Sequence, residues 1–328
     1  MKQRKLGADG PMVGALGLGC MSFGATASGA TDQATSYAAM DMAWDMGLTH
    51  FDTANVYGPH TSEQIVGQWM ADRGHHPSIA TKAGIQRDLD HPVNNDPAYL
   101  EVELDGSLAR LGVDHVDLFY IHRREQAVPI ADVAGFMGRM VEKGKIGGWG
   151  LSEVSPTTLR LAHAQTPVRA VQNEYSLWTR QPELGLIAEC AQLGVAFVAF
   201  SPLARGVFGR TIIDPSDPDF GPFRAVMPRF QPDLWPRNKC RAEEFGELAA
   251  KIGTTPPALA LAWLLAQGDH IIPIPGTRTA HHMSDWADAD KIDMTPALVA
   301  QIETILPVGW AWGDRYADSQ ARTPEAYC

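Results

Sequence analysis

The sequence predicts an α/β protein, a (β/α)8 TIM barrel with an N-terminal β-hairpin and extended loops at the carboxyl face of its strands. Strand and helix signals alternate along the 328 residues with a period of about 30 to 40 residues, which is typical of βα units in a parallel sheet. The alternation contains eight candidate strands. Because such a barrel takes about 250 residues plus insertions, residues 1–328 are expected to form one domain, with a tail from about residue 307.

The candidate strands are short apolar runs. They are residues 15–20, 48–52, 78–82, 116–121, 146–151, 170–174, 195–200 and 271–274. Residues 1–12 precede them and contain the turn sequence GADGP at positions 7–11. These turn residues predict a small β-hairpin before the first barrel strand.

Two of the intervening helices carry clear start and stop signals. Asp96 can cap a helix whose first residue is Pro97, and Gly112 can end it. The apolar residues of this helix recur at helical spacing and are Leu100, Leu104, Leu108 and Leu111. Ser155 and Pro156 repeat the same start before a second helix. Such punctuation supports the βα alternation.

Composition excludes several classes of function. A formal net charge of −11 and a pI near 5.4 argue against a nucleic-acid binder, whose footprint is basic. The four cysteines lack CxxC or Cys/His ligand spacing, so no metal site is predicted. The N-terminus does not lead into an apolar signal core, and no apolar stretch approaches the ~20 residues of a membrane span. We therefore expect a cytoplasmic protein without membrane partners.

Four polar residues follow the predicted strands in a way that indicates a catalytic site. Asp52, Lys82 and His122 each lie at or just beyond the end of a candidate strand, and Tyr57 lies in the loop after Asp52. Carboxyl ends of parallel strands meet at one mouth of a barrel, so the four side chains are expected to converge there.

These residue types permit a narrow chemistry. A phenol is a poor acid near neutral pH, with a reference pKa of about 10. A neighbouring ammonium favours the phenolate, a carboxylate keeps that ammonium charged, and an imidazole can direct a carbonyl oxygen at the phenol. Such a group suits proton donation to a developing alkoxide. Since the sequence offers no nucleophile or metal shell, the hydride must come from a bound cofactor.

The segments around these residues resemble the aldo-keto reductase superfamily. They are FDTANVYG (51–58), ATKAG (80–84), YIHR (120–123), GLS (150–152), QNEYSLWTR (172–180), AFSPL (199–203) and IPGTR (274–278). The resemblance runs in order over roughly residues 1–290 and is strongest to the bacterial and plant NADPH-dependent reductases. It implies that the N-terminal hairpin closes the bottom of the barrel.

The resemblance also implies an activity. A relative of this type reduces an aldehyde or ketone with NADPH, with NADH less favoured, and the reaction is reversible. Hydride passes from nicotinamide C4 to the carbonyl carbon while Tyr57 protonates the oxygen. Lys82 would lower the Tyr57 pKa, Asp52 would support Lys82, and His122 would orient the carbonyl. The partner is thus a small-molecule carbonyl substrate, and the oligomeric state stays open.

Cofactor contacts are implied in the later strand ends and loops. Ser152 and Gln172 would bond the nicotinamide carboxamide, and Phe200 would stack on its ring. The pyrophosphate would run along Ser201, Leu203 and Arg205. The adenosine end would meet Gly276, Thr277, Arg278, His282 and Asp285. Gly276 replaces a lysine that many relatives place on the 2′-phosphate, which leaves Arg278 as the expected cation. Glu153 stands where many relatives have Asn.

The substrate cleft is expected to be lined by Met21, Tyr57, His122 and Trp178, and the tail residues Trp310, Trp312 and Tyr316 are expected to cover it. The stretch from residue 214 to 236 is too long for a simple βα loop, and we expect it to reach toward cofactor or substrate.

The glycines of residues 14–22 could indicate the glycine-rich fingerprint of a dinucleotide-binding Rossmann unit. The next helix, however, is expected to start at Thr31 or Asp32, which is too late in the sequence for such a unit. A lysine-dependent aldolase on the same barrel would use Lys82 as a Schiff base. A regulatory cofactor-binding protein is a further alternative, because the cytoplasmic β-subunits of potassium channels also resemble this superfamily.

Overall fold

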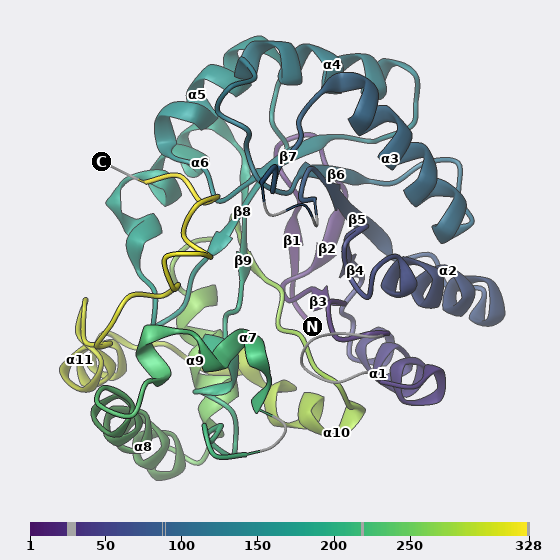
Figure 1. Cartoon of the computed structure of the whole chain (residues 1–328). Helices are drawn as coiled ribbons and strands as arrows, with labels where there is room; N and C mark the ends of the chain where they lie inside the picture. Colours follow the sequence, from purple (N-terminus) through teal and green to yellow (C-terminus); the bar gives the residue numbers. More distant parts are fainter. Residues whose placement is uncertain (25–30, 87, 89, 218–219, 327–328) are drawn as a thin grey trace.

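The computed structural model describes residues 1–24, 31–86, 88, 90–217 and 220–326. Eight parallel strands form one curved sheet in sequence order, from β3 to β10 (Figure 1). They are β3 (Leu18–Gly19), β4 (His50–Asp52), β5 (Ser78–Ala83), β6 (Leu118–Ile121), β7 (Trp149–Ser152), β8 (Ala170–Glu174), β9 (Ala196–Phe200) and β10 (Ile271–Pro273). This architecture confirms the predicted (β/α)8 barrel, although most strands are shorter than expected.

Backbone bonds between its first and last strands close the barrel. The amide of Gly17 donates to Pro273 O at 2.9 Å, and that of Gly19 donates to Pro275 O at 3.0 Å. Gly19 and Gly276 also form a parallel bridge. A side chain at Gly19 would place its Cβ 2.9 Å from Ile274 O. The seam therefore depends on close backbone approach at glycine.

Helices surround the sheet. The longer ones are α1 (Gln33–Asp45), α2 (Thr61–Arg73), α3 (Pro97–Leu111), α4 (Ile130–Glu142), α5 (Pro156–Gln165), α6 (Leu186–Leu193), α8 (Trp235–Lys251), α9 (Pro256–Leu265) and α11 (Pro296–Ile305). The predicted caps are confirmed. Asp96 accepts bonds from the amides of Ala98 and Tyr99 at the start of α3, and Gly112 ends it with φ 68°. Ser155 caps α5, and α1 begins directly after Asp32.

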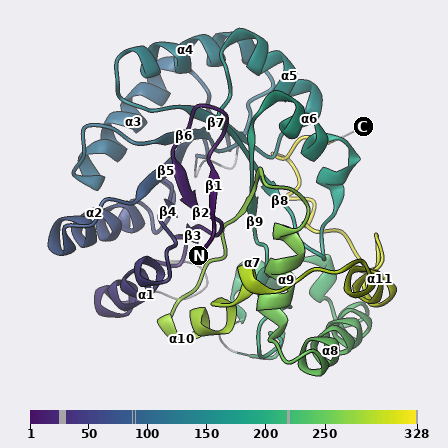
Figure 2. The same cartoon turned by 180° about the vertical axis from the view of Figure 1, so that it is seen from behind.

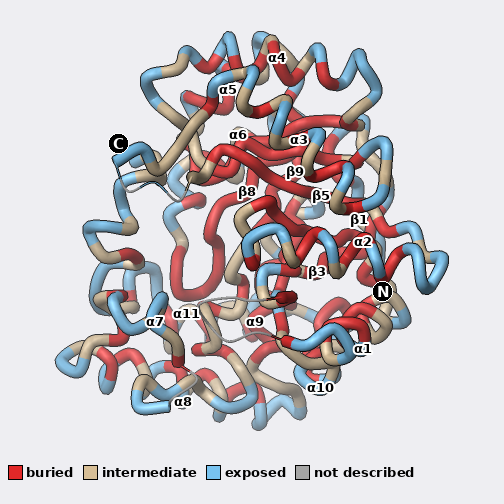
Figure 3. The backbone as a smooth tube through the Cα atoms, turned by 45° about the vertical axis from the view of Figure 1, so that its right-hand side comes forward, coloured by how far each residue is buried: buried red, intermediate tan, exposed pale blue. Residues whose placement is uncertain are grey.

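The N-terminal hairpin covers one end of the barrel (Figure 2). Its strands β1 (Gln3–Lys5) and β2 (Met12–Gly14) pair antiparallel, as predicted. Leu6 and Val13 of the hairpin are buried in a small cluster with inward residues of the barrel strands. Those inward residues are Ala80, Leu118, Tyr120, Ala170, Ala196, Val198, Ile272 and Ile274. A larger core fills the space between sheet and helices, so burial follows the strands in Figure 3.

The long segment after β9 is partly ordered into short helices, α7 (Pro222–Ala225) and η4 (Pro228–Phe230). The tail after α11 runs past the ends of β8 and β7 toward α5 (Figure 1). Within the described ranges no single helix is long and apolar enough to cross a membrane; α8 and α9 pass such a test only as a pair bent by 89°.

Candidate active site

Asp52 and Lys82 form a buried ion pair inside the barrel mouth. Asp52 ends β4, and Lys82 lies near the end of the neighbouring strand β5. The Lys82 ammonium bonds the Asp52 carboxylate and donates to Thr53 O at 2.7 Å. Both side chains are buried, so this pair is protected from solvent screening.

Tyr57 and His122 lie beside the pair. The rings of Tyr57 and His122 meet edge to face with centroids 5.8 Å apart. The Lys82 Nζ is 5.1 Å from the centre of the Tyr57 ring. Tyr57 is half-buried, whereas His122, directly after β6, is buried. The structure therefore brings together all four residues that the sequence singled out.

Two effects act in opposite directions on the pKa of Tyr57. Burial raises the pKa of Tyr57 above its usual value, and the positive charge of Lys82 only partly offsets this. Burial would lower the pKa of Lys82, but Asp52 and Tyr57 outweigh it and raise that pKa. Lys82 thus acts on the Tyr57 pKa in the predicted direction, but burial outweighs it and the net pKa is raised. Tyr57 is protonated and Lys82 charged at neutral pH.

His122 is neutral. Burial, together with the charges of Arg123 and Lys82, holds the pKa of His122 well below its usual value. Its Nδ1 is buried and has no hydrogen-bond partner within the part of the chain that the structure describes. A neutral imidazole keeps one N–H donor for an incoming oxygen.

Ser152 and Gln172 are directly paired in the register of β7 and β8. The Gln172 Nε2 donates to the second oxygen of Asp52 at 2.7 Å, so Gln172 also holds the Asp52 carboxylate in place. The Ser152 hydroxyl accepts from Arg123 Nη1 at 3.0 Å. The Gln172 carbonyl oxygen and the Ser152 hydroxyl hydrogen remain able to accept and donate. This acceptor and donor fit the two ends of a carboxamide.

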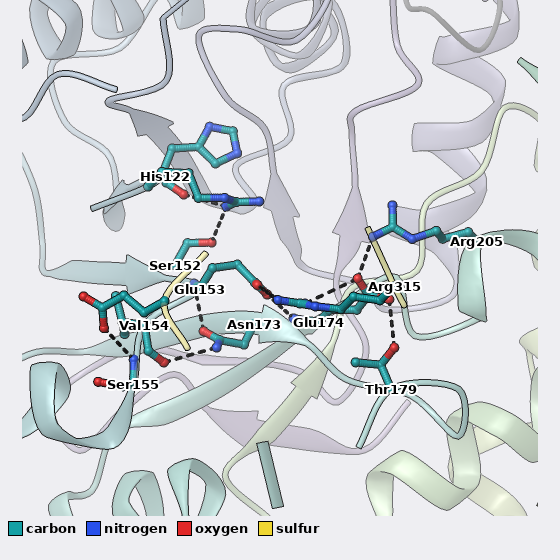
Figure 4. A network of polar contacts seen from close by, with 12 residues as sticks. His122, Ser152, Glu153, Val154, Ser155, Asn173, Glu174, Thr179, Arg205 and Arg315 are labelled. Carbon is teal, nitrogen blue, oxygen red and sulfur yellow. Dashed lines mark hydrogen bonds and ion pairs between the residues drawn. The ribbon is translucent and has the colours of Figure 1, made fainter. Parts of the chain in front are cut away.

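Arg205 lies in a strained turn after β9. Ser201, Ala204 and Arg205 all have positive φ, at 50°, 51° and 59°. Figure 4 shows the Arg205 guanidinium directed at Glu174, to which it is bonded at 2.5 Å. Phe200 and Leu203, which precede Arg205 in the sequence, are half-buried. Arg205 is therefore engaged by a carboxylate where the sequence predicts a pyrophosphate contact.

A buried charge network that the sequence did not reveal joins the tail to the strand ends. Arg315 forms ion pairs with Glu153 and, at 3.5 Å, with Glu174 (Figure 4). Glu153 has a φ of 57° and accepts from the Glu174 amide at 2.8 Å. Farther along, Glu325 accepts from the Ser155 amide at 2.8 Å. The signal in the sequence that could have pointed to this network was Glu153, which stands where many relatives have Asn.

The loop after β10 contains the predicted adenosine contacts. Gly276 lies at the barrel seam against Gly19. The Thr277 hydroxyl donates to Thr279 O at 2.9 Å and lies 3.3 Å from His282 Nδ1. Asp285 is buried and accepts from Arg210 Nε at 2.6 Å.

Arg278 is half-buried in this loop beside Thr277. Since Arg278 and His282 follow Thr277 closely, the loop offers a guanidinium, a hydroxyl and an imidazole over six residues.

The predicted substrate residues differ in exposure. Met21 is 48% exposed, but Trp178 is buried and packs against Phe230 and Trp310. The Trp310 indole donates to Leu177 O at 2.5 Å. Trp178 is therefore buried in the contact between the barrel and the tail. Its role in substrate binding stays a prediction.

A parallel eight-stranded barrel with an Asp–Lys–Tyr–His cluster at its carboxyl mouth defines a class of barrel oxidoreductases. Comparison with known proteins makes the class specific. A model of the Aldo/keto reductase family matches residues 15–307. The chain belongs to this family.

Its relatives cover nearly the whole chain. It is 37% identical over 315 residues to "Probable aldo-keto reductase 1" from Glycine max, across 95% of this chain and 91% of that protein. It is also 37% identical over 321 residues to "Aldo-keto reductase yakc [NADP(+)]" from Schizosaccharomyces pombe, across 95% and 94%. The solved glycerol dehydrogenase from Gluconobacter oxydans superposes with a TM-score of 0.82 at 26% identity, across 93% and 94% of the two chains.

Proposed function

We propose that this protein reduces an aldehyde or ketone to an alcohol with NADPH, and that Tyr57 donates the proton. The observation that carries the proposal is the cluster of Tyr57, Lys82, Asp52 and His122 at the barrel mouth. A protonated phenol beside a charged ammonium and a neutral imidazole suits the protonation of a developing alkoxide.

Each residue of the cluster has a separate task. The nicotinamide supplies the hydride when it is bound. His122 donates its N–H to the carbonyl oxygen and so directs that oxygen toward Tyr57. Tyr57 gives its proton to the oxygen, and the ammonium of Lys82 stabilises the phenolate that remains. Asp52 balances the charge of Lys82, and Gln172 holds Asp52 in place.

Cofactor binding is assigned to the later strand ends. Ser152 and Gln172 would hold the carboxamide through the donor and acceptor that they leave available. Arg278 and Thr277 would bind the 2′-phosphate, since a guanidinium binds phosphate bidentately. The relative from Schizosaccharomyces pombe carries NADP(+) in its name, which supports NADPH as the cofactor.

The aldolase alternative is disfavoured by the state of Lys82. A Schiff base needs a neutral amine, but Asp52 and Tyr57 raise the pKa of Lys82 despite its burial. The ammonium is also held by Asp52 and Thr53 O. Borohydride trapping with a carbonyl compound should therefore leave Lys82 unlabelled.

The deciding experiment is a screen of aldehydes, ketones and sugars that follows NADPH absorbance. Steady turnover with a linear dependence on enzyme concentration is expected. Tight NADPH binding with negligible turnover across the screen would instead favour a regulatory cofactor-binding protein. Labelling of Lys82 by borohydride would favour the aldolase.

A further inference from the structure

Arg123 places a positive charge beside the catalytic cluster. It follows His122, and its Nη1 donates to His122 O at 2.6 Å and to Ser152 Oγ at 3.0 Å. The guanidinium therefore bridges the ends of β6 and β7, and the side chain is half-buried. Both acceptors are neutral, so neither balances its charge.

The bonding of Arg123 contrasts with that of its neighbour. Arg124 pairs with Glu325 at 2.5 Å, whereas Arg123 has no carboxylate partner among the residues that the structure describes. Arg224 and Arg229 also donate to neutral acceptors, but each does so through two nitrogens. Arg123 uses one nitrogen. A guanidinium carries five N–H donors, so its Nε and Nη2 can still bind an oxyanion.

The charge of Arg123 reaches the reacting groups. Burial is the largest influence on the pKa of His122 and lowers it, and Arg123 is the next. Burial raises the pKa of Tyr57, and Lys82 and Arg123 both oppose that rise. An anion bound by Arg123 would thus lie within electrostatic range of the carbonyl that Tyr57 protonates.

We propose that Arg123 binds a carboxylate of the substrate, so that the protein prefers carbonyl compounds that carry a carboxylate near the reacting carbonyl. This inference rests on the proposed reductase function. A planar guanidinium with two available nitrogens matches a planar, singly charged carboxylate in a bidentate pair. Arg123 would then set substrate specificity without moving a proton itself.

The test compares each carboxylate substrate with its uncharged methyl ester. The ortho, meta and para isomers of carboxybenzaldehyde are each paired with their methyl ester, and NADPH oxidation gives kcat/KM for each. With the parent protein, at least one acid should exceed its ester by about tenfold or more, the size of one charge-assisted bond. In Arg123→Gln this ratio should fall to about one, and Arg123→Lys should restore part of it.

The ratio of kcat/KM for the acid to kcat/KM for its ester separates a loss of specificity from a general loss of activity. If Arg123 only supported Ser152, acid and ester would lose rate together and the ratio would stay at the parent value, which would overturn the inference. Arg124→Gln is the control and should keep the parent ratio. Parent protein that reduces esters without preferring any acid would also overturn it. Parent protein that reduces none of the six compounds, nor any compound of the wider screen, would instead count against the reductase function.

Discussion

Burial raises the pKa of Tyr57 and the charge of Lys82 opposes that rise, so Tyr57 keeps its proton and can act as the donor. Because Tyr57 is protonated at neutral pH, Tyr57→Phe removes the donor while leaving the ring and its contact with His122. Turnover should fall by at least ~10²-fold, the lower end of a general-acid contribution. NADPH affinity, measured by fluorescence titration, should stay near the parent value. Reduction of a standard aldehyde at the parent rate would remove Tyr57 from its role.

Lys82 should govern the pH dependence of the reverse reaction. In the proposed mechanism, alcohol oxidation uses the Tyr57 phenolate as a base, and Lys82 opposes the rise that burial gives to the Tyr57 pKa. Lys82→Met removes that opposition, so the Tyr57 pKa should rise further. The increase of oxidation rate with pH should then occur at higher pH, and reduction near neutral pH should weaken because the phenolate product loses its counter-charge.

Removing one partner of a buried pair also destabilises the fold, by about 3–5 kcal/mol. Asp52→Asn combined with Lys82→Met avoids the uncompensated carboxylate and serves as the folding control. Because Asp52 itself raises the Tyr57 pKa, the double variant tests folding only. A pH profile of folded Lys82→Met protein that matches the parent would show that another cation tunes Tyr57.

Arg278 tests the cofactor assignment. A 2′-phosphate adds negative charge to an acidic protein, so preference for NADPH requires a nearby cation. Arg278→Ala should raise the NADPH KM by about tenfold or more while changing the NADH KM much less. Equal losses for both cofactors would indicate loop damage or a lost adenine contact, and no loss for either would place the phosphate elsewhere.

At this scale the sequence predicts residues that share a strand-end position, because parallel strands bring their carboxyl ends to one mouth. Asp52, Lys82 and His122 follow from that rule. The partners of Gln172 and Arg205 do not, since the choice between a cofactor and a neighbouring carboxylate depends on how the loops pack. Likewise, residue type alone cannot give the direction of the Tyr57 pKa, because burial decides it.

Among the elements, the tail shows how a segment without a strong pattern gains its place from charge pairs. Arg315 is 15% exposed and bonds Glu153 and Glu174, which are buried. The sequence indicated that the tail would cover the barrel mouth through aromatic residues. The structure adds an anchor of ion pairs, which could not be predicted because its acidic members, Glu153 and Glu174, lie far from the tail in sequence, directly after β7 and at the end of β8.

Arg315→Met should release the tail. The change leaves two buried carboxylates with one fewer cation, and moving the tail away lets water reach them. Hydrogen exchange and limited proteolysis should show faster exchange and cleavage across residues 307–326, with a lower melting temperature. Arg322→Met is the matched control, because Arg322 is exposed in the same tail and should leave all three readouts near the parent values. A tail that stays protected in Arg315→Met would show that its other contacts, such as those of Trp310 and Glu325, suffice.

For the whole molecule, the alternation of strands and helices was enough to predict the barrel. A parallel sheet must be buried on both faces, and the connections between its strands are short and right-handed, so few arrangements of βα units are possible. Strand lengths were less predictable. The first candidate strand, residues 15–20, pairs regularly only at Leu18–Gly19, because Ala15 instead bonds Lys2 O at 2.8 Å on its way from the hairpin.

Closure of the barrel yields the last prediction. Gly19 lies on the seam between β3 and β10, where an added Cβ would meet Ile274 O at 2.9 Å. Backbone cannot retreat there without lengthening the bond from the Gly19 amide to Pro275 O, which is 3.0 Å. Gly19→Ala should therefore destabilise the barrel by about 1–3 kcal/mol, as overpacking does, and lower the urea midpoint. Gly135→Ala, in the middle of α4 with only the tip of Arg139 within 4 Å, is the matched control. It should raise the midpoint, because alanine favours a helix interior over glycine by roughly 1 kcal/mol. A Gly19→Ala midpoint at or above the parent value would show that the seam does not depend on close approach at this glycine.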